Sequence, residues 1–194
     1  MTEKEKMEQG LWYDANFDQN LLDDRLKAES ICYQYNMTDP LNKEKQRSLL
    51  KQLFEDLEED VTILPPLACD YGYRTTIGKG CFINHNAYFM DAGSITIKDH
   101  VFIGPNCGLY TANHPLDAEK RNSGLEIALP IRIGNNVWIG ADVTILLGVS
   151  IGDNAVIGAK SLVTKDVPAN TLAFGNPCKA IRKITKEDRI CNHR

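Results

Sequence analysis

The side chain best suited to proton transfer in this sequence is His114, in the stretch TANHP at residues 111–115. An imidazole has an unperturbed pKa of about 6.5, so it can take a proton at neutral pH. A positioned base of this kind accelerates a reaction by about 10²–10⁴-fold. Residues 111–130 show no hydrophobic period, and so long an irregular stretch inside a domain is usually functional or disordered. We therefore predict that His114 is a general base at the foot of a long loop.

Two other kinds of chemistry are conceivable near His114. A catalytic zinc site needs three protein ligands and one open position. His85, His100 and His114 supply the residue type, but their spacing is not one typical of such a site. A thiol nucleophile is present at Cys107, seven residues before His114, at a small inward position of the repeat described below, where a thiol is inert. We expect no catalytic role for His85, His100 or His193.

The elements that would position His114 follow from a six-residue repeat in the second half of the chain. Neither a helix nor an alternating strand has this period, whereas a coil of short strands, with a corner after each strand, does. Because one copy cannot bury its own aliphatic residue, the copies must stack. The aliphatic positions are Ile133, Ile139, Ile145, Ile151, Ile157 and Val163. The small or β-branched positions four residues later are Val137, Val143, Val149, Ala155, Ser161 and Val167.

A weaker form of the same repeat precedes the loop. It consists of Ile77, Ile83 and Phe89 and then, after a slip of two residues at Ile95–Thr96, of Ile97, Ile103 and Leu109. A slip of this size predicts a local bulge or a shifted corner. The coil is therefore expected on both sides of the loop.

Residues 1–60 have the pattern of helices that cover another element. Leu49, Leu50 and Leu53 belong to one apolar stripe at helical spacing. Asp39 is the expected cap of this helix, with Pro40 at its first position.

Composition excludes several classes of function. The formal net charge is -4, without the basic footprint of a nucleic-acid-binding protein. No apolar run approaches the ~18 residues that span a membrane, and the charged N-terminus does not resemble a secretion signal. We expect a cytoplasmic protein without nucleic-acid or membrane partners. Its cysteines form no CxxC pair and are expected to be buried free thiols. They are Cys32, Cys69, Cys81, Cys107, Cys178 and Cys191.

The repeat and several longer motifs together resemble one family, the hexapeptide-repeat acyltransferases of the maltose and galactoside O-acetyltransferase group. The motifs, in chain order, are KEKMEQGLWYDANFDQNLLDDRLKA, CDYGYRTTIG, TANHP, RNSG, PIRIGNNVWIGADV, IGDNAVIGA, LVTKDVPAN and GNPCKAIR. The resemblance implies a mainly β fold, a left-handed parallel β-helix. We expect an N-terminal helical segment at 1–60, the β-helix at 61–177 with an extended loop at 111–130, and a short C-terminal tail at 178–194.

The resemblance also implies an activity. An acetyl group would pass from acetyl-CoA, as co-substrate, to a sugar hydroxyl by direct attack, with no bound metal or other cofactor. The family implies a homotrimer in which the loop brings His114 to a groove of a neighbouring subunit.

The same resemblance assigns residues to roles. The catalytic residues are His114 and Glu126, the latter as an orienting partner on the other ring nitrogen of the base. The expected acceptor residues are Asp14, Asp70, Asn84 and Asp91, and Asn84 is also a candidate donor to the oxyanion. The expected coenzyme A residues are Trp138, Ala141, Ala159, Thr164, Lys165, Lys179 and Arg182. Each has a plain structural alternative: turn capping for the aspartates, a solvated basic surface for the cations, and a core or subunit contact for the tryptophan.

Three other functions remain open on the sequence alone. The same coil can carry an acetyltransferase that acts on a non-sugar acceptor such as serine or an antibiotic. It can also be a non-catalytic binding protein, although the long loop and the terminal basic cluster would then have no role. A β-helix zinc enzyme of the carbonic anhydrase type is the third.

Overall fold

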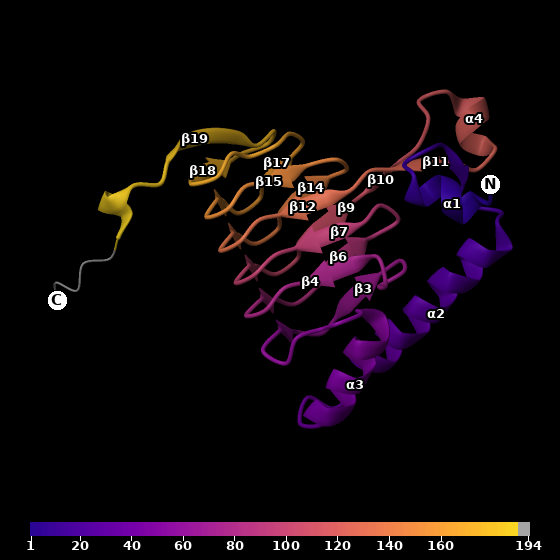
Figure 1. Ribbon diagram of the computed structural model, residues 1–194, viewed down its shortest axis with the longest axis horizontal. Helices are drawn as coiled ribbons and strands as arrows, with labels where there is room; N and C mark the ends of the chain where they lie inside the picture. Colours follow the sequence, from indigo (N-terminus) through magenta and orange to yellow (C-terminus); the bar gives the residue numbers. More distant parts are fainter. Residues whose placement is uncertain (190–194) are drawn as a thin grey trace.

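Three parallel β-sheets wind into one left-handed coil of about six turns, and the computed structural model describes residues 1–189 of the chain (Figure 1). The first face contains β2 (Thr62–Ile63), β5 (Phe82–Ile83), β8 (Phe102–Ile103), β13 (Trp138–Ile139), β16 (Val156–Ile157) and β18 (Thr171–Phe174). The second face contains β3 (Leu67–Cys69), β6 (Ala87–Met90), β9 (Gly108–Tyr110), β14 (Thr144–Leu146) and β17 (Leu162–Val163). The third face contains β4 (Thr75–Ile77), β7 (Ile95–Ile97), β12 (Ile131–Ile133) and β15 (Ser150–Ile151).

The aliphatic positions of the repeat stack in register along the axis of the coil. Ile139 pairs with Ile103 on one side and with Ile157 on the other. Ile145 lies in the same way between Leu109 and Val163. All six side chains are fully buried. The six-residue period is confirmed as the period of a parallel coil whose interior is one continuous aliphatic column.

The corner between the first and second faces explains why asparagine and aspartate recur. Asn86, Asn106, Asp142 and Lys160 occupy this corner in successive turns with φ of 60°, 59°, 57° and 60°. Asparagine and aspartate tolerate this left-handed conformation better than other side chains with a Cβ. The Asn86 amide donates to Asn106 Oδ1 at 2.9 Å, and the Asn106 amide donates to Asp142 Oδ1 at 3.0 Å. The polar ladder therefore ties the turns of the coil together on its outside.

The corner between the second and third faces is longer, and it is where the irregular segments leave the coil. It comprises residues 70–74 in the first turn, residues 91–94 in the second and residues 111–130 in the third. The slip predicted at Ile95–Thr96 falls at the start of β7, and the extra residues lie just before it, in the second of these corners. Three successive turns therefore direct their extra residues to one edge of the coil.

The segment expected to be an irregular loop has its own structure. β10 (Ala112–Asn113) and β11 (Leu125–Ala128) form an antiparallel pair, and α4 (Ala118–Asn122) connects them. β1 (Tyr13–Asp14) adds to the other side of β11, so the N-terminal segment and the loop share a three-stranded sheet. Figure 1 shows this sheet and α1 (Glu3–Glu8) beside one another, away from the axis of the coil.

Two longer helices cover the first turn of the coil. α2 (Gln19–Asn36) packs against β3, and α3 (Lys43–Leu53) packs against α2 at the same end of the coil (Figure 1). The cap predicted at Asp39 is wrong, because α3 begins at Lys43 and Asn42 accepts from the amide of Lys45. Asp39 instead accepts from the amide of Leu41 at 2.8 Å and stabilises the preceding turn.

The first turn of the coil has no earlier strand, and side chains replace one. The Asn36 amide group donates to the carbonyl of Leu67 at 2.9 Å and accepts from its N–H at 2.8 Å. The Tyr35 hydroxyl donates to the carbonyl of Ile63 at 2.5 Å. The helices therefore satisfy the open edge as well as covering apolar surface.

At the other end, β19 (Lys179–Lys183) folds back antiparallel on β18, and a short 3₁₀ turn (Lys186–Asp188) follows it away from the coil (Figure 1). Cys191 and His193 lie outside the described residues.

Candidate active site

His114 directly follows β10, at the foot of the hairpin. Its side chain is 44% exposed. Its backbone N–H donates to Asn113 Oδ1 at 2.9 Å, and Nδ1 lies 3.1 Å from the carbonyl oxygen of Leu125. A carbonyl only accepts, so Nδ1 carries the proton of the neutral ring and Nε2 keeps the lone pair. The hairpin therefore fixes a ring whose Nε2 is the basic nitrogen.

Glu126 lies beside Nε2, the basic nitrogen of the ring, whereas it was expected beside the other nitrogen, Nδ1. Its Oε2 is 3.7 Å from His114 Nε2, while Nδ1 is held by the Leu125 carbonyl. The prediction that Glu126 orients the opposite nitrogen is therefore not what the geometry shows. A carboxylate at this distance does not occupy the lone pair, but its charge favours the imidazolium that forms when Nε2 takes a proton.

The environment of Glu126 combines burial with several polar groups. Its side chain is only 14% exposed, and burial raises the pKa of its carboxyl above the ordinary value. A hydrogen bond from Tyr13, the charge that His114 carries when protonated and the positive charge of Arg25 act against this rise in the pKa. The Glu126 carboxyl is thus mostly buried, and its pKa depends on each of these neighbouring groups.

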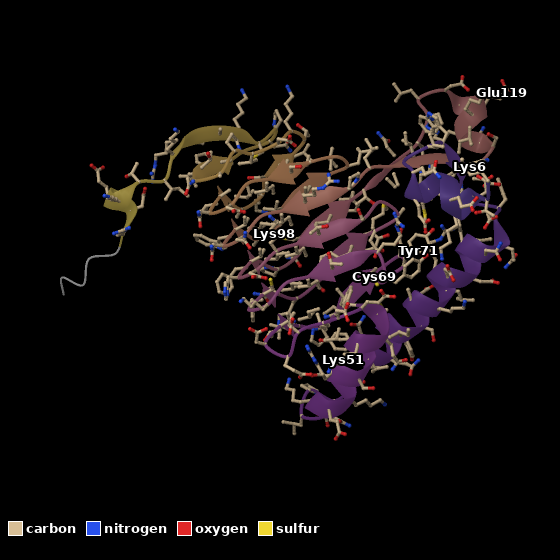
Figure 2. All side chains as sticks on the ribbon, viewed as in Figure 1. Lys6, Lys51, Cys69, Tyr71, Lys98 and Glu119 are labelled. Atoms are coloured by element: carbon tan, nitrogen blue, oxygen red, sulfur yellow. The ribbon has the colours of Figure 1, made fainter. Side chains whose placement is uncertain are left out.

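The N-terminal part of this environment was missed by the sequence reasoning. Tyr13 pairs with Glu126 in the register of β1 and β11, and its hydroxyl donates to Glu126 Oε1. Arg25, on α2, donates to the Tyr71 hydroxyl at 2.8 Å and to the carbonyl of Ala15 at 2.5 Å. Figure 2 shows Tyr71 between the coil and α2. The Arg25–Tyr71 and Tyr13–Glu126 contacts join positions 46 and 113 residues apart, and no local pattern marks them.

Asp70 is an acceptor candidate that interacts by charge with Arg25 and Glu126. It begins the long corner of the first turn, is half-buried, and accepts from the Tyr88 hydroxyl at 2.6 Å. Burial raises the pKa of Asp70, and the charge of Arg25 opposes the rise. Asp70 in turn acts on the pKa of Glu126, which it helps to raise by like charge. Asp70, Arg25 and Glu126 therefore share one electrostatic environment.

Asp91 lies near Asp70, but its side chain is closed off from an acceptor. Its side chain is fully buried, Oδ1 accepts from the Tyr71 amide at 2.8 Å, and Oδ2 accepts from the Thr75 hydroxyl at 2.9 Å. The expectation that Asp91 contacts an acceptor is corrected, because both carboxylate oxygens serve to connect two long corners of the coil.

Asp14 and Asn84 have local partners of their own. Asp14 is half-buried, and its Oδ1 accepts from the amides of Asn16 at 3.1 Å and Phe17 at 3.0 Å. Asn84 is half-buried at the corner between the first and second faces, and its Oδ1 accepts from the His85 amide at 2.8 Å. Within one chain, Asn84 is thus on a different corner from His114.

Cys107 has the environment predicted for an unreactive thiol. It is buried, its Sγ donates to the Gly140 carbonyl at 3.1 Å, and burial raises its pKa. A raised pKa keeps the sulfur protonated and weakly nucleophilic.

Four of the seven coenzyme A candidates lie along the edge of the first face. Trp138 projects outward and is 58% exposed. Ala141 and Ala159 follow β13 and β16 at the same corner, where a Cβ on Gly140 would come within 2.7 Å of the Ala159 nitrogen. Lys179 pairs with Phe174 at the end of β18. This edge therefore offers close access to backbone, an aromatic wall and a cation.

The other three candidates are placed differently. Thr164 and Lys165 are exposed and follow β17 at the edge between the second and third faces. Arg182 lies on β19, but its guanidinium binds both oxygens of Asp188, at 2.6 and 2.8 Å. In this arrangement the guanidinium is held within the tail by Asp188 and by the Lys183 carbonyl.

The structure also bears on metals and membranes. His85, His100 and His114 lie on three different corners of the coil. Among residues 1–189, no group of three or more His, Cys, Asp or Glu side chains is arranged to hold a metal ion. In the same part of the chain, no helix combines the length and apolar character needed to cross a membrane.

Comparisons with known proteins agree with this architecture. Residues 6–58 match the maltose acetyltransferase hexapeptide capping motif, and residues 130–165 match the hexapeptide repeat of succinyl-transferase. The chain is 54% identical, over 96% of its length and 94% of the relative's, to a Staphylococcus aureus (strain MRSA252) protein named for acetyltransferase activity. A maltose O-acetyltransferase from Clostridium difficile 630 is 46% identical with a TM-score of 0.93, covering 96% of this chain and 99% of that one. A galactoside acetyltransferase in complex with coenzyme A is 37% identical with a TM-score of 0.90, covering 100% and 96%. The chain therefore belongs to the hexapeptide-repeat acyltransferases of the maltose and galactoside O-acetyltransferase family.

Proposed function

We propose that the protein transfers an acetyl group from acetyl-CoA to a hydroxyl group of a sugar, with His114 as the general base. The proposal rests on the partners of the two nitrogens of the His114 ring. Nδ1 is held by the Leu125 carbonyl, Nε2 is the basic nitrogen, and a mostly buried carboxylate lies 3.7 Å from it. Membership of an acetyltransferase family supplies the class of reaction that needs such a base.

The chemistry proceeds by direct transfer. His114 Nε2 takes the proton as the acceptor oxygen attacks the carbonyl carbon of the thioester. A tetrahedral oxyanion forms, collapses with cleavage of the C–S bond, and the imidazolium returns its proton to the leaving thiolate. Glu126 stabilises the imidazolium by charge. A covalent route through Cys107 is disfavoured because this thiol is buried and its pKa is raised.

The acceptor and the donor occupy different parts of the molecule in this proposal. The acceptor binds near Asp70, with Asp14 beside the hairpin, since carboxylates accept hydrogen bonds from sugar hydroxyls. The donor lies along the edge formed by Trp138, Ala141 and Ala159. The complex of a galactoside acetyltransferase with coenzyme A supports a donor site on this fold.

We further propose a homotrimer in which a neighbouring subunit completes the site. Asn84 and His114 lie on different corners of one coil. Two chains side by side bring such corners together, with Asn84 of one beside the hairpin of the next. The outward aromatic side chains support a covered face, since Phe102 and Trp138 are 53% and 58% exposed.

The test is release of free thiol from acetyl-CoA with a panel of acceptors: maltose, glucose, a galactoside, serine and chloramphenicol. Sugar-dependent release supports the proposal. Release with serine or chloramphenicol alone would keep the enzyme class and replace the acceptor. Binding of acetyl-CoA without release on any acceptor would favour a non-catalytic binding protein.

A further inference from the structure

We propose that Tyr13 is a positioning residue for the catalytic base, acting through Glu126, and that the N-terminal segment is therefore a working part of the site. The inference rests on the proposed role of His114. It goes beyond that role because the residue comes from a strand that precedes the coil by almost fifty residues.

The contacts form a chain of three side chains. Tyr13 is fully buried, and its hydroxyl donates to Glu126 Oε1. The other carboxylate oxygen of Glu126 lies 3.7 Å from His114 Nε2. One oxygen is thus fixed by a buried donor while the second remains directed at the base.

The backbone holds Tyr13 in this place from several sides. The register of β1 on β11 sets Tyr13 opposite Glu126. The next turn of chain is tied by the Ala15 amide, which donates to the Gly124 carbonyl at 3.1 Å. Arg25 Nη2 donates to the carbonyl of Ala15 at 2.5 Å. A tyrosine on a frayed terminus would not give a fixed donor, but this one is on a paired strand.

Removal of the hydroxyl has a defined consequence for Glu126. The groups that act on this carboxyl are Tyr13 from β1, His114 from the hairpin, Arg25 from α2 and Asp70 from the first long corner. The Tyr13 hydrogen bond lowers the pKa of Glu126 against the effect of burial. Without it the carboxyl is less ionised at a given pH and free to rotate away from His114.

The variant that isolates this effect is Tyr13→Phe, because the ring that fills the site is kept. Its matched control is Tyr35→Phe, which also removes a buried hydroxyl but one that donates to the Ile63 carbonyl under α3. We expect kcat to fall roughly 10-fold in Tyr13→Phe, as for loss of a hydrogen bond to a charged group. The KM for acetyl-CoA should not change, and Tyr35→Phe should keep the wild-type kcat.

A double variant separates positioning from general packing. In the background of Glu126→Gln, Tyr13→Phe should lower kcat by less than twofold, because its effect passes through the lost carboxylate. A full 10-fold effect in that background would overturn the proposal. So would a wild-type kcat in the single variant.

A second readout needs no substrate. Carboxyl ¹³C NMR of glutamate-labelled protein, with the Glu126 signal identified from Glu126→Gln, should show a higher pKa for Glu126 in Tyr13→Phe than in wild type or Tyr35→Phe. An unchanged titration would overturn the link from Tyr13 to Glu126. If no acceptor is acetylated, the proposed function fails, and this titration still decides the role of Tyr13.

Discussion

The two nitrogens of His114 face different partners, and this difference is the basis of the proposed mechanism. A backbone carbonyl holds Nδ1, whereas a carboxylate lies near Nε2 without occupying its lone pair. A carbonyl cannot become protonated in this role, so it sets the ring without competing for the transferred proton. In the proposed mechanism Glu126 acts by charge, and its burial strengthens that charge effect while making its ionisation sensitive to each neighbour.

The proposed role of Asp70 in acceptor binding leads to a prediction for Asp70→Asn. The variant keeps the shape of the side chain and an oxygen for the Tyr88 hydroxyl but removes the charge. We expect the acceptor KM to rise about tenfold, since hydrogen bonds to charged groups contribute roughly 1.5–3 kcal/mol. Steady-state kinetics with each substrate varied in turn will check it. An acceptor KM that does not change would exclude Asp70 from the acceptor site.

At the scale of residues, the sequence supports His114 as a candidate base but not the groups around it. TANHP and the aperiodic segment single out His114 locally. Tyr13 and Arg25 depend on pairing of β1 with β11 and on the course of α2, which no local pattern encodes. Asp91 fails as an acceptor candidate because burial of a carboxylate depends on the neighbouring corner, not on its own motif.

At the scale of elements, the candidate catalytic residues and the acceptor candidate Asp70 lie at the long corners of the coil. The regular corners need only a left-handed residue and a small neighbour, so they give the strict six-residue period. The spacing from Cys69 to Ile77 and from Phe89 to Ile97 is eight, which is readable in the sequence as two longer corners. The structure of the 111–130 segment is not readable in this way, because its hairpin is stabilised by β1 from outside.

Asn36, on α2, forms the hydrogen bonds with Leu67 that an earlier strand would otherwise form, and Asn36→Ala tests their contribution to stability. The change removes both hydrogen bonds to Leu67 and leaves its buried N–H and carbonyl without partners. We expect the free energy of unfolding to fall by about 2–4 kcal/mol, at roughly 1–3 kcal/mol for each unsatisfied group with partial access to water. Denaturant unfolding will measure it. Gln34→Ala, an exposed position on the same helix, is the control, and equal stability of the two variants would contradict this role.

The long corners also predict a dependence of stability on pH. Burial raises the pKa of Asp91 to about 6 from an ordinary value of 3.8. The folded state therefore binds this proton more tightly than the unfolded state, and stability is lost as pH rises from about 4 through about 6. Relative to Asp91→Asn, the wild type should lose on the order of 2–3 kcal/mol over this range. Unfolding curves at pH 4, 5, 6 and 7 will check it, and parallel pH profiles for the two proteins would contradict it.

At the scale of the whole molecule, the coil leaves apolar side chains in positions that a second chain would cover. Leu116, two residues after His114, is 97% exposed at the loop. If the loop meets a neighbouring subunit, Leu116→Asp should weaken the proposed trimer, whose mass would be about 65 kDa for chains of 21.7 kDa. Analytical ultracentrifugation will show it as a shift toward smaller species. Leu41→Asp, at an 89% exposed position between α2 and α3, should leave the mass unchanged, and equal behaviour of both variants would contradict the placement.

The measurement that tests the account most directly is the turnover of His114→Ala beside that of His100→Asn. His100 is a corner residue with φ of 57°, a conformation that asparagine adopts readily, so this control removes an imidazole without disturbing the coil. On an accepted sugar, we predict that kcat of His114→Ala falls by ~10²-fold or more while acetyl-CoA still binds and His100→Asn keeps its rate. A folded His114→Ala protein with the wild-type kcat would contradict the central claim.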